Sequence, residues 1–222
     1  MKHLDPEVIS LARADHARYL AALSGPVATR PALLSLLAFD AEISRIPHMV
    51  SEPMLGRIRL QWWLDVLPGI TGGRPPGHPV AQALARLSLD TQALRALVEA
   101  RNFDLDGDVT AASEVQAYAQ ATGGALQALM LAQLGVDDIG ANAAARDIGA
   151  ALTLANLGHD EHARDLLRRA REHTLTQAVK KAALPTLMLA RLVDRRLRLG
   201  PRANDGAGAV LSVWWGLLTG RY

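Results

Sequence analysis

Apolar residues recur at helical spacing along almost the whole chain, and this periodicity limits the possible folds more than any other feature. Residues 31 to 43 show it best, since their leucines, Phe39 and Ile43 point to one side of a helix. Leu and Ala dominate such segments and β-branched residues are scarce, which favours helix over strand. The chain has 222 residues, enough for one domain with a substantial core. We therefore expect an all-α, single-domain protein.

Proline and glycine divide the chain into the expected helices. Asp5 followed by Pro6 predicts an N-cap and a first helix that runs to about Leu23. Pro53 predicts a further helix start after a break near Pro47. The Gly/Pro-rich residues 68 to 77 predict the clearest loop of the chain.

Several function classes are excluded by what the sequence lacks. It contains no cysteine, so disulfides, thiolate catalysis and thiolate metal sites are ruled out. No apolar run reaches the ~18 to 20 residues that cross a bilayer, and the charged N-terminus does not fit a signal peptide. These features predict a cytoplasmic protein without a spanning helix. No reader motif for nucleic acid is present, so no nucleic-acid partner is expected.

Four stretches, taken in order, carry a family resemblance. Residues 30 to 62 contain Arg-x-Ala-Leu, an apolar run to Phe39, and Leu-x-Trp; His78-Pro79 begins a later helix, and Tyr118 precedes Gly123 in another. With Leu152, Leu154, Asn156 and Leu157, this order resembles the squalene/phytoene synthase family over roughly residues 8 to 165. The resemblance implies an isoprenoid-synthase-like helical bundle around a central apolar cavity. That domain would cover residues 1 to 222, with residues 205 to 222 as an apolar, Trp-rich tail.

The acidic motifs of that family are eroded here. Family members join two prenyl diphosphates with carboxylates that hold Mg²⁺, and the resemblance puts the first acids at Ser44, Arg45 and His48. In the second motif one aspartate survives, and Arg164 stands where the other is expected. The remnant catalytic candidates are Asp40, Glu42, Asp160 and Asp165. Asp40 and Glu42 lie ~200° apart on a helical wheel, so they do not form a pair on one face.

A second group of residues could line a ligand pocket. The candidates are Tyr19, Arg30, Phe39, Gln61, Trp62, Tyr118, Gly123 and Asn156. Core packing is the competing interpretation for Tyr19. The adjacent Trp62 and Trp63 point ~100° apart, which places one of them in the core and the other on a surface. Gly123 and Gly124 in mid-helix indicate a close helix contact that requires no ligand.

Two motifs suggest metal binding without supporting it. Residues 104 to 108 repeat aspartate, but the glycine and glutamate positions of a calcium loop hold valines. His159 and His162 share one helical turn and have no third ligand at a zincin spacing. We expect no metal and no cofactor, apart from Mg²⁺ if the chain is a prenyltransferase.

The C-terminal third is basic and ends in aromatic residues. Residues 164 to 202 hold eleven lysines and arginines against three acidic residues, whereas residues 99 to 147 hold eight acidic residues against two arginines. The basic helix and the tail together suggest contact with an anionic membrane surface. Docking of the tail into a groove of the protein itself is the alternative. The membrane or partner candidates are Arg195, Arg196, Arg198, Trp214 and Trp215.

Three functions remain open at this point. The first is a non-catalytic relative that binds or assembles a respiratory membrane complex, peripherally at the inner membrane. Residues 51 to 53 and 58 to 63 resemble the branch of the family whose mitochondrial members help to assemble complex I. The second is a prenyltransferase with rearranged acids. The third is a metal-free carrier of an isoprenoid or another lipid.

Overall fold

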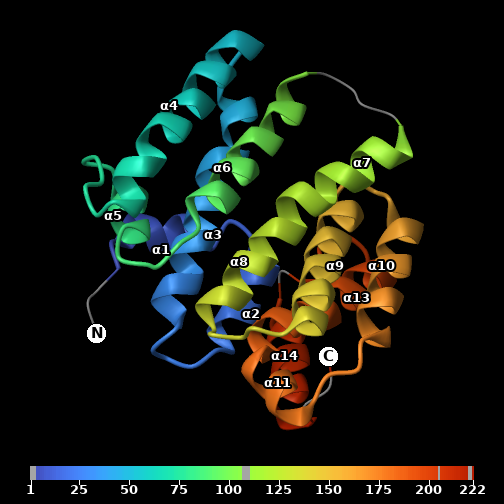
Figure 1. Cartoon of the computed structure of the whole chain (residues 1–222). Coiled ribbons are helices and arrows are strands. Elements are labelled where there is room, and N and C mark those ends of the chain that lie inside the picture. Colours follow the sequence, from blue (N-terminus) through green and yellow to red (C-terminus); the bar gives the residue numbers. More distant parts are fainter. Residues whose placement is uncertain (1–3, 107–110, 205, 220–221) are drawn as a thin grey trace.

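The computed structural model describes residues 4–106, 111–204, 206–219 and 222, and these residues form helices with no strand (Figure 1). The predicted all-α class is confirmed. The α-helices of the first half are α1 (Pro6–Ala12), α2 (His16–Leu23), α3 (Arg30–Ser44), α4 (Pro53–Thr71), α5 (Pro79–Leu84) and α6 (Thr91–Ala100). Those of the second half are α7 (Ala112–Ala119), α8 (Ala125–Gln133), α9 (Ile139–Asn156), α10 (Asp160–Glu172), α11 (Gln177–Ala182), α12 (Leu184–Leu187), α13 (Leu189–Leu199) and α14 (Ala207–Thr219). The 3₁₀ turns η1 (Ile46–Met49) and η2 (Arg101–Leu105) and the π-helical turn η3 (Gln120–Gly124) connect them.

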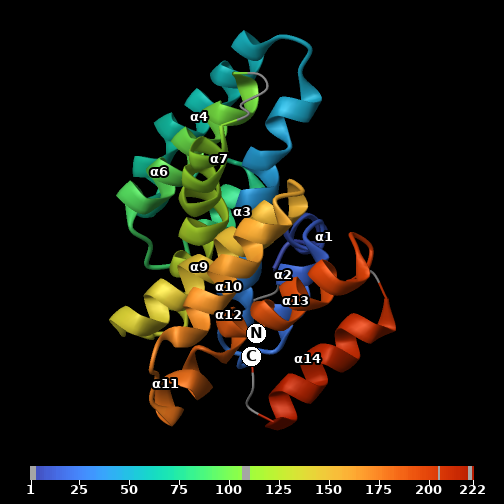
Figure 2. The same cartoon turned by 90° about the vertical axis from the view of Figure 1, so that its right-hand side faces the viewer.

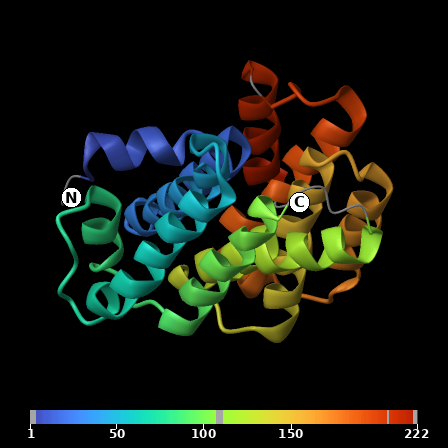
Figure 3. The ribbon, with the colours of Figure 1, turned by 90° about the horizontal axis from the view of Figure 1, so that it is seen from above.

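Two hydrophobic clusters form the core. One is built mainly by α1, α3, α4, α5, α6 and α8, with Phe39 fully buried in it. The other surrounds α9, whose Ile148 is also fully buried, and includes α10, α13 and one face of α14. Viewed from above, the helices of the first cluster lie beside those of the second (Figure 3). The expected central apolar cavity stays a prediction, because the hollows described below open on the surface.

Two glycines allow close approach of helices near the junction of the clusters. A Cβ atom added at Gly149 of α9 would overlap the backbone of Gly123 in η3, and one added at Gly123 would overlap Gly149 and Thr153. Arg18 of α2 adds a hydrogen bond, its Nη2 donating to the carbonyl of Gly149 at 3.2 Å. The close helix contact predicted from Gly123 and Gly124 is therefore present.

Two helix boundaries differ from the sequence-based expectation. The segment predicted as the first helix forms two helices, α1 and α2. Asp15 is the N-cap of α2, and its carboxylate accepts a hydrogen bond from the Arg18 amide at 2.9 Å. α4 continues through Pro68 to Thr71, so the loop begins at Gly72 and not at Pro68. Proline removes one helical hydrogen bond, but the buried Leu67 and Ile70 on either side hold this last turn against the core.

Candidate functional site

The remnant acid Asp40 is bound by an arginine of the same chain. Arg101, the first residue of η2, lies with its Nη2 2.6 Å from Oδ1 of Asp40 on α3. Nη1 of Arg101 donates a hydrogen bond to the hydroxyl of Tyr118 at 2.7 Å and lies 3.6 Å from Asp104. Only 8% of Arg101 is exposed. The buried guanidinium of Arg101 thus neutralises Asp40, one of the remnant catalytic candidates.

The electrostatics of this cluster favour a charged arginine and a neutral tyrosine. Burial alone lowers the pKa of Arg101, but the nearby Asp40, Tyr118 and Asp104 outweigh it and raise the pKa above its ordinary value. Burial is the main reason why the pKa of Tyr118 is also raised, against the opposing charge of Arg101. At neutral pH the cluster therefore contains a charged Arg101 and a protonated Tyr118.

Glu42, two residues after Asp40 on α3, lines a hollow. Its carboxylate lies 2.6 Å from Arg45 and 4.0 Å from His78. The hollow there has a volume of about 290 Å³, and its walls include Trp62 and Trp63. Trp63 is 3% exposed and Trp62 is 40% exposed, so one tryptophan is in the core and the other on the surface, as predicted.

The other two remnant acids lie on α10, and each pairs with a nearby arginine of that helix. Asp160 lies 3.9 Å from Arg164, and Asp165 lies 2.9 Å from Arg168. All four side chains are about half exposed or more. These pairs are surface contacts of one helix, and the two acids do not converge on a common point.

The residues present do not fit a magnesium cluster. No group of three histidine or acidic side chains close enough to hold a metal occurs in the part of the chain that the structure describes. Where the family resemblance implies the first motif, the chain has Ser44, Arg45 and His48. Arg45 is engaged with Glu42 at 2.6 Å, so a positive charge stands where carboxylates would be needed.

The predicted pocket residues are distributed over several parts of the molecule. Phe39 lies in the core with its ring edge-on to Trp63, their centroids 5.1 Å apart. The hydroxyl of Tyr19 accepts a hydrogen bond from Arg13 at 3.2 Å. Arg30 donates to the Gly25 carbonyl at 2.9 Å, and Gln61 donates to Asp65 at 2.7 Å. Asn156 lines a polar hollow of about 250 Å³ between α2 and α13, and Gly123 packs against α9.

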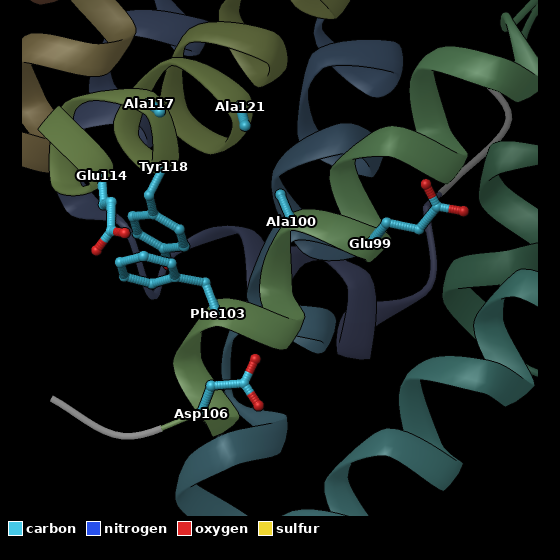
Figure 4. A pocket seen from close by; sticks show the side chains of 8 residues that line it. All are labelled: Glu99, Ala100, Phe103, Asp106, Glu114, Ala117, Tyr118 and Ala121. Carbon is cyan, nitrogen blue, oxygen red and sulfur yellow. The ribbon is translucent and has the colours of Figure 1, made fainter. Parts of the chain in front are cut away.

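Tyr118 lines the groove that the close-up shows (Figure 4). This groove of about 510 Å³ lies between the end of α6 with η2 and the helical segment of α7 with η3. Phe103 stacks on Tyr118 with ring centroids 4.5 Å apart and an angle of 19°. Three alanines and three acidic side chains complete the lining: Ala100, Ala117, Ala121, Glu99, Asp106 and Glu114. Of the predicted pocket residues, Tyr118 is the one found in this groove.

The basic candidates on α13 bond to backbone carbonyls. Arg195 donates to Ala203 at 3.0 Å, Arg196 to Ala155 at 2.8 Å, and Arg198 to Asp194 of its own helix at 3.3 Å. Arg195 thus holds the chain between α13 and α14 in place, and Arg196 holds the end of α9. Their charges stay near the surface around α13.

Helix α14 has one face on the protein and one face in solvent (Figure 2). Ala209, Val213 and Gly216 are buried against α2 and α13, where Gly216 lies against Met188. The opposite side exposes large apolar side chains: Val210, Leu211, Trp214, Trp215, Leu217 and Leu218. The tail thus docks on the protein and keeps an exposed apolar face, and its contact with a membrane stays a prediction. Among the described residues, no helix is both long and apolar enough to cross a membrane.

Arg101, Phe103 and His78 were not among the predicted site residues. Arg101 is one of the two arginines in the acidic stretch of residues 99 to 147, and its partner Asp40 lies 61 residues earlier. One signal for it existed, because a single arginine directly after an amphipathic helix and beside several acids is a candidate for a buried ion pair.

The chain is similar to a known protein family and to several known proteins. The family model of squalene/phytoene synthase matches residues 11–171. The NADH dehydrogenase (ubiquinone) complex I, assembly factor 6 of Bos taurus is 33% identical over 146 residues, which are 64% of this chain and 44% of that protein. The Homo sapiens protein of the same name gives the same values, and the Drosophila melanogaster homolog is 30% identical over 154 residues, 64% of this chain and 46% of that protein.

A solved structure supports the fold. A dehydrosqualene synthase in complex with a ligand aligns with a TM-score of 0.65 at 14% identity, covering 96% of this chain and 94% of that one. At this identity the likeness shows the isoprenoid-synthase fold alone. The chain spans less than half the length of the curated relatives named above. Because the family model covers most of its residues, the chain belongs to the squalene/phytoene synthase family.

Proposed function

We propose that this chain is a non-catalytic member of its family that supports assembly of a respiratory complex at a membrane. The observation that carries the proposal is the pairing of Asp40 with Arg101, because it commits a remnant carboxylate to an internal cation. The similarity to proteins named complex I assembly factor 6 supplies the class of partner.

Prenyl transfer requires a cluster of free carboxylates, and the remnant acids of this chain do not form one. Ionisation of a diphosphate needs several carboxylates that hold Mg²⁺ against the leaving group. Here each of the remnant acids is paired with an arginine of the chain: Asp40, Glu42, Asp160 and Asp165. Binding of another protein or of a lipid surface needs no such cluster, so it is the function that these residues support.

The open face of α14 supports peripheral contact with a membrane. Trp214 and Trp215 are 64% and 61% exposed on a helix without charged residues. Lys180 and Lys181 line a hollow of about 350 Å³ next to Leu217 and Leu218. Tryptophan prefers the headgroup zone of a bilayer, and lysines attract anionic lipids. We therefore extend the proposal to an anionic membrane surface as the site of action.

Two experiments test the function. Calorimetric titration of the purified protein with farnesyl diphosphate, with and without Mg²⁺, is expected to show no metal-dependent binding and no release of diphosphate. Deletion of the gene from its source organism is expected to lower NADH:ubiquinone oxidoreductase activity in membranes, and the re-expressed chain should restore it. Metal-dependent turnover, or normal oxidoreductase activity after deletion, would refute the proposal.

A further inference from the structure

The groove between η2 and α7 combines an apolar floor with an acidic rim. Its floor is the stacked pair of Phe103 and Tyr118, whose rings lie 4.5 Å apart. Ala100, Ala117 and Ala121 have short side chains, which leaves a volume of about 510 Å³ open beside the rings. An apolar or planar group of a ligand can therefore lie flat in the groove.

The floor is held in place from below by the buried ion pair. Tyr118 is 8% exposed, and its hydroxyl receives the hydrogen bond from Arg101 at 2.7 Å. That bond fixes the ring, and the ring in turn positions Phe103. A fixed aromatic surface loses little conformational entropy when a ligand binds, which favours binding.

The charged side chains that line the groove have one sign. Every charged side chain that lines it is a carboxylate, from Glu99, Asp106 and Glu114. Glu114 points toward the two rings, whereas Asp106 lies beyond Phe103 (Figure 4). Asp106 is paired with Arg57, and Glu99 lies 3.5 Å from Arg95, but no ion pair between described residues involves Glu114. A diphosphate would be repelled here, and a cation would be attracted.

We propose that this groove binds a basic, apolar segment of a partner protein, with an arginine or lysine between the Phe103 ring and the Glu114 carboxylate. A guanidinium over an aromatic face gains cation–π attraction, and the carboxylate beside it adds an ion pair. The partner is taken to be a protein because the inference rests on the proposed function, in which the chain works by binding one. The groove is separate from the apolar face of α14, so the chain can contact a partner and a membrane with different surfaces.

The test is fluorescence anisotropy with the purified full chain and a short labelled peptide in which leucine and arginine alternate. The matched probe alternates leucine and glutamate. We expect binding of the arginine peptide only, weakened by added salt because the contact is charged and solvent-exposed. Glu114→Lys is expected to weaken binding by about ten-fold or more, and Phe103→Ala by about five-fold, as for anchor residues of an interface.

A control variant separates local from general electrostatics. Glu161 is an exposed acid in the first turn of α10, as Glu114 is in the first turn of α7. Glu161→Lys changes the net charge equally and should leave peptide affinity unchanged. Glu114→Gln, which introduces no positive charge, is the second variant if the lysine variant shows altered circular dichroism.

The outcomes separate this inference from the proposed function. Equal binding of the two peptides, equal loss in Glu161→Lys, or no loss in the Glu114 variants would overturn the groove as a basic-segment site. Such a result with normal rescue of oxidoreductase activity refutes this inference alone. Peptide binding that depends on Glu114, together with failed rescue by the unaltered chain, refutes the proposed function instead.

Discussion

Arg101 lies 2.6 Å from Asp40 across the interior of the bundle and so joins η2 to α3. The side chains are only 10% and 14% exposed, so solvent screens their attraction weakly. The same guanidinium holds the hydroxyl of Tyr118, which connects α7 to the pair. Three helical segments, α3, η2 and α7, therefore depend on one side chain.

Replacement of Arg101 by methionine should destabilise the fold strongly. It would leave the largely buried Asp40 without its countercharge, which typically costs about 3 to 5 kcal/mol. Chemical denaturation followed by circular dichroism would measure the loss. The matched control is Arg57→Met, whose pair with Asp106 is about half exposed and should contribute about 1 kcal/mol or less. Similar losses in the two variants would contradict the assignment.

A methyl group at Gly149 should force α9 away from η3. The added Cβ would overlap the carbonyl of Gly123, a backbone group that cannot rotate away. We expect Gly149→Ala to lose about 1 to 3 kcal/mol of unfolding free energy, although alanine favours helix. Gly77→Ala is the comparison, since nothing lies within 4 Å of a Cβ there. A stabilised Gly149→Ala protein would show that the helices are not in close contact.

Stability should fall with rising pH above about 10 because of Tyr118. Burial raises its pKa in the folded state above the ordinary value of 10.0. The unfolded chain then releases the tyrosine proton at a lower pH than the folded protein does. The stabilisation by neutral Tyr118 is therefore complete below pH 10 and is lost as the pH rises through the folded-state pKa. The pKa of Tyr222 is also raised by burial and acts in the same range. Urea unfolding between pH 9 and 11 should therefore show a shallower decline in Tyr118→Phe, whereas an unchanged slope would contradict the assignment.

The acids of α10 should be dispensable. Asp160 and Asp165 are 49% and 66% exposed and pair with arginines of their own helix. Replacement of either by alanine is expected to change the unfolding free energy by less than about 1 kcal/mol. Rescue of oxidoreductase activity by the Asp160→Ala variant should equal that by the unaltered chain. A loss of rescue in a stably folded variant would restore Asp160 as a functional residue.

Membrane contact should depend on the tryptophans of α14. Sedimentation with vesicles of phosphatidylcholine and phosphatidylglycerol is expected to carry the protein down, and Trp214→Ser with Trp215→Ser should abolish most of this binding. The partition preference of tryptophan for the bilayer interface is the reason. Lys180→Glu with Lys181→Glu should weaken binding to these vesicles, because the glutamates repel the anionic lipid.

Ile139→Ser provides the control for the vesicle experiment. Ile139 is 92% exposed at the start of α9, outside the apolar face of α14. Its replacement should leave sedimentation unchanged. Equal loss in this variant would mean that general surface hydrophobicity, not α14, drives the association.

Most of the fold could be predicted because helix signals are local. Pro53 and Pro79 begin α4 and α5 as expected, and the apolar spacing identified α3. The break before α2 has a local cause, the cap at Asp15, whereas the error at Pro68 occurred because tertiary contacts outweigh local preference. Pro68 continues a helix because Leu67 and Ile70 are buried, and burial is not visible in a short window of sequence.

The site was less predictable because it depends on pairing between distant residues. Helical geometry predicted that Asp40 and Glu42 would diverge, and the two face different partners, Arg101 and Arg45. It could not predict which arginine would reach Asp40, since η2 and α3 meet only in the folded protein. The stacking of Phe103 on Tyr118 was missed for the same reason.

The buried pair also has a consequence for how the fold responds to its surroundings. Arg101 is a countercharge that cannot dissociate, because it is part of the polypeptide, and its pKa lies above the ordinary value for arginine. The carboxylate of Asp40 therefore stays neutralised in the presence of chelators such as EDTA and through changes in the cellular supply of divalent ions. The countercharge of Asp40 is encoded in the polypeptide, so no metal ion has to bind after synthesis to neutralise it.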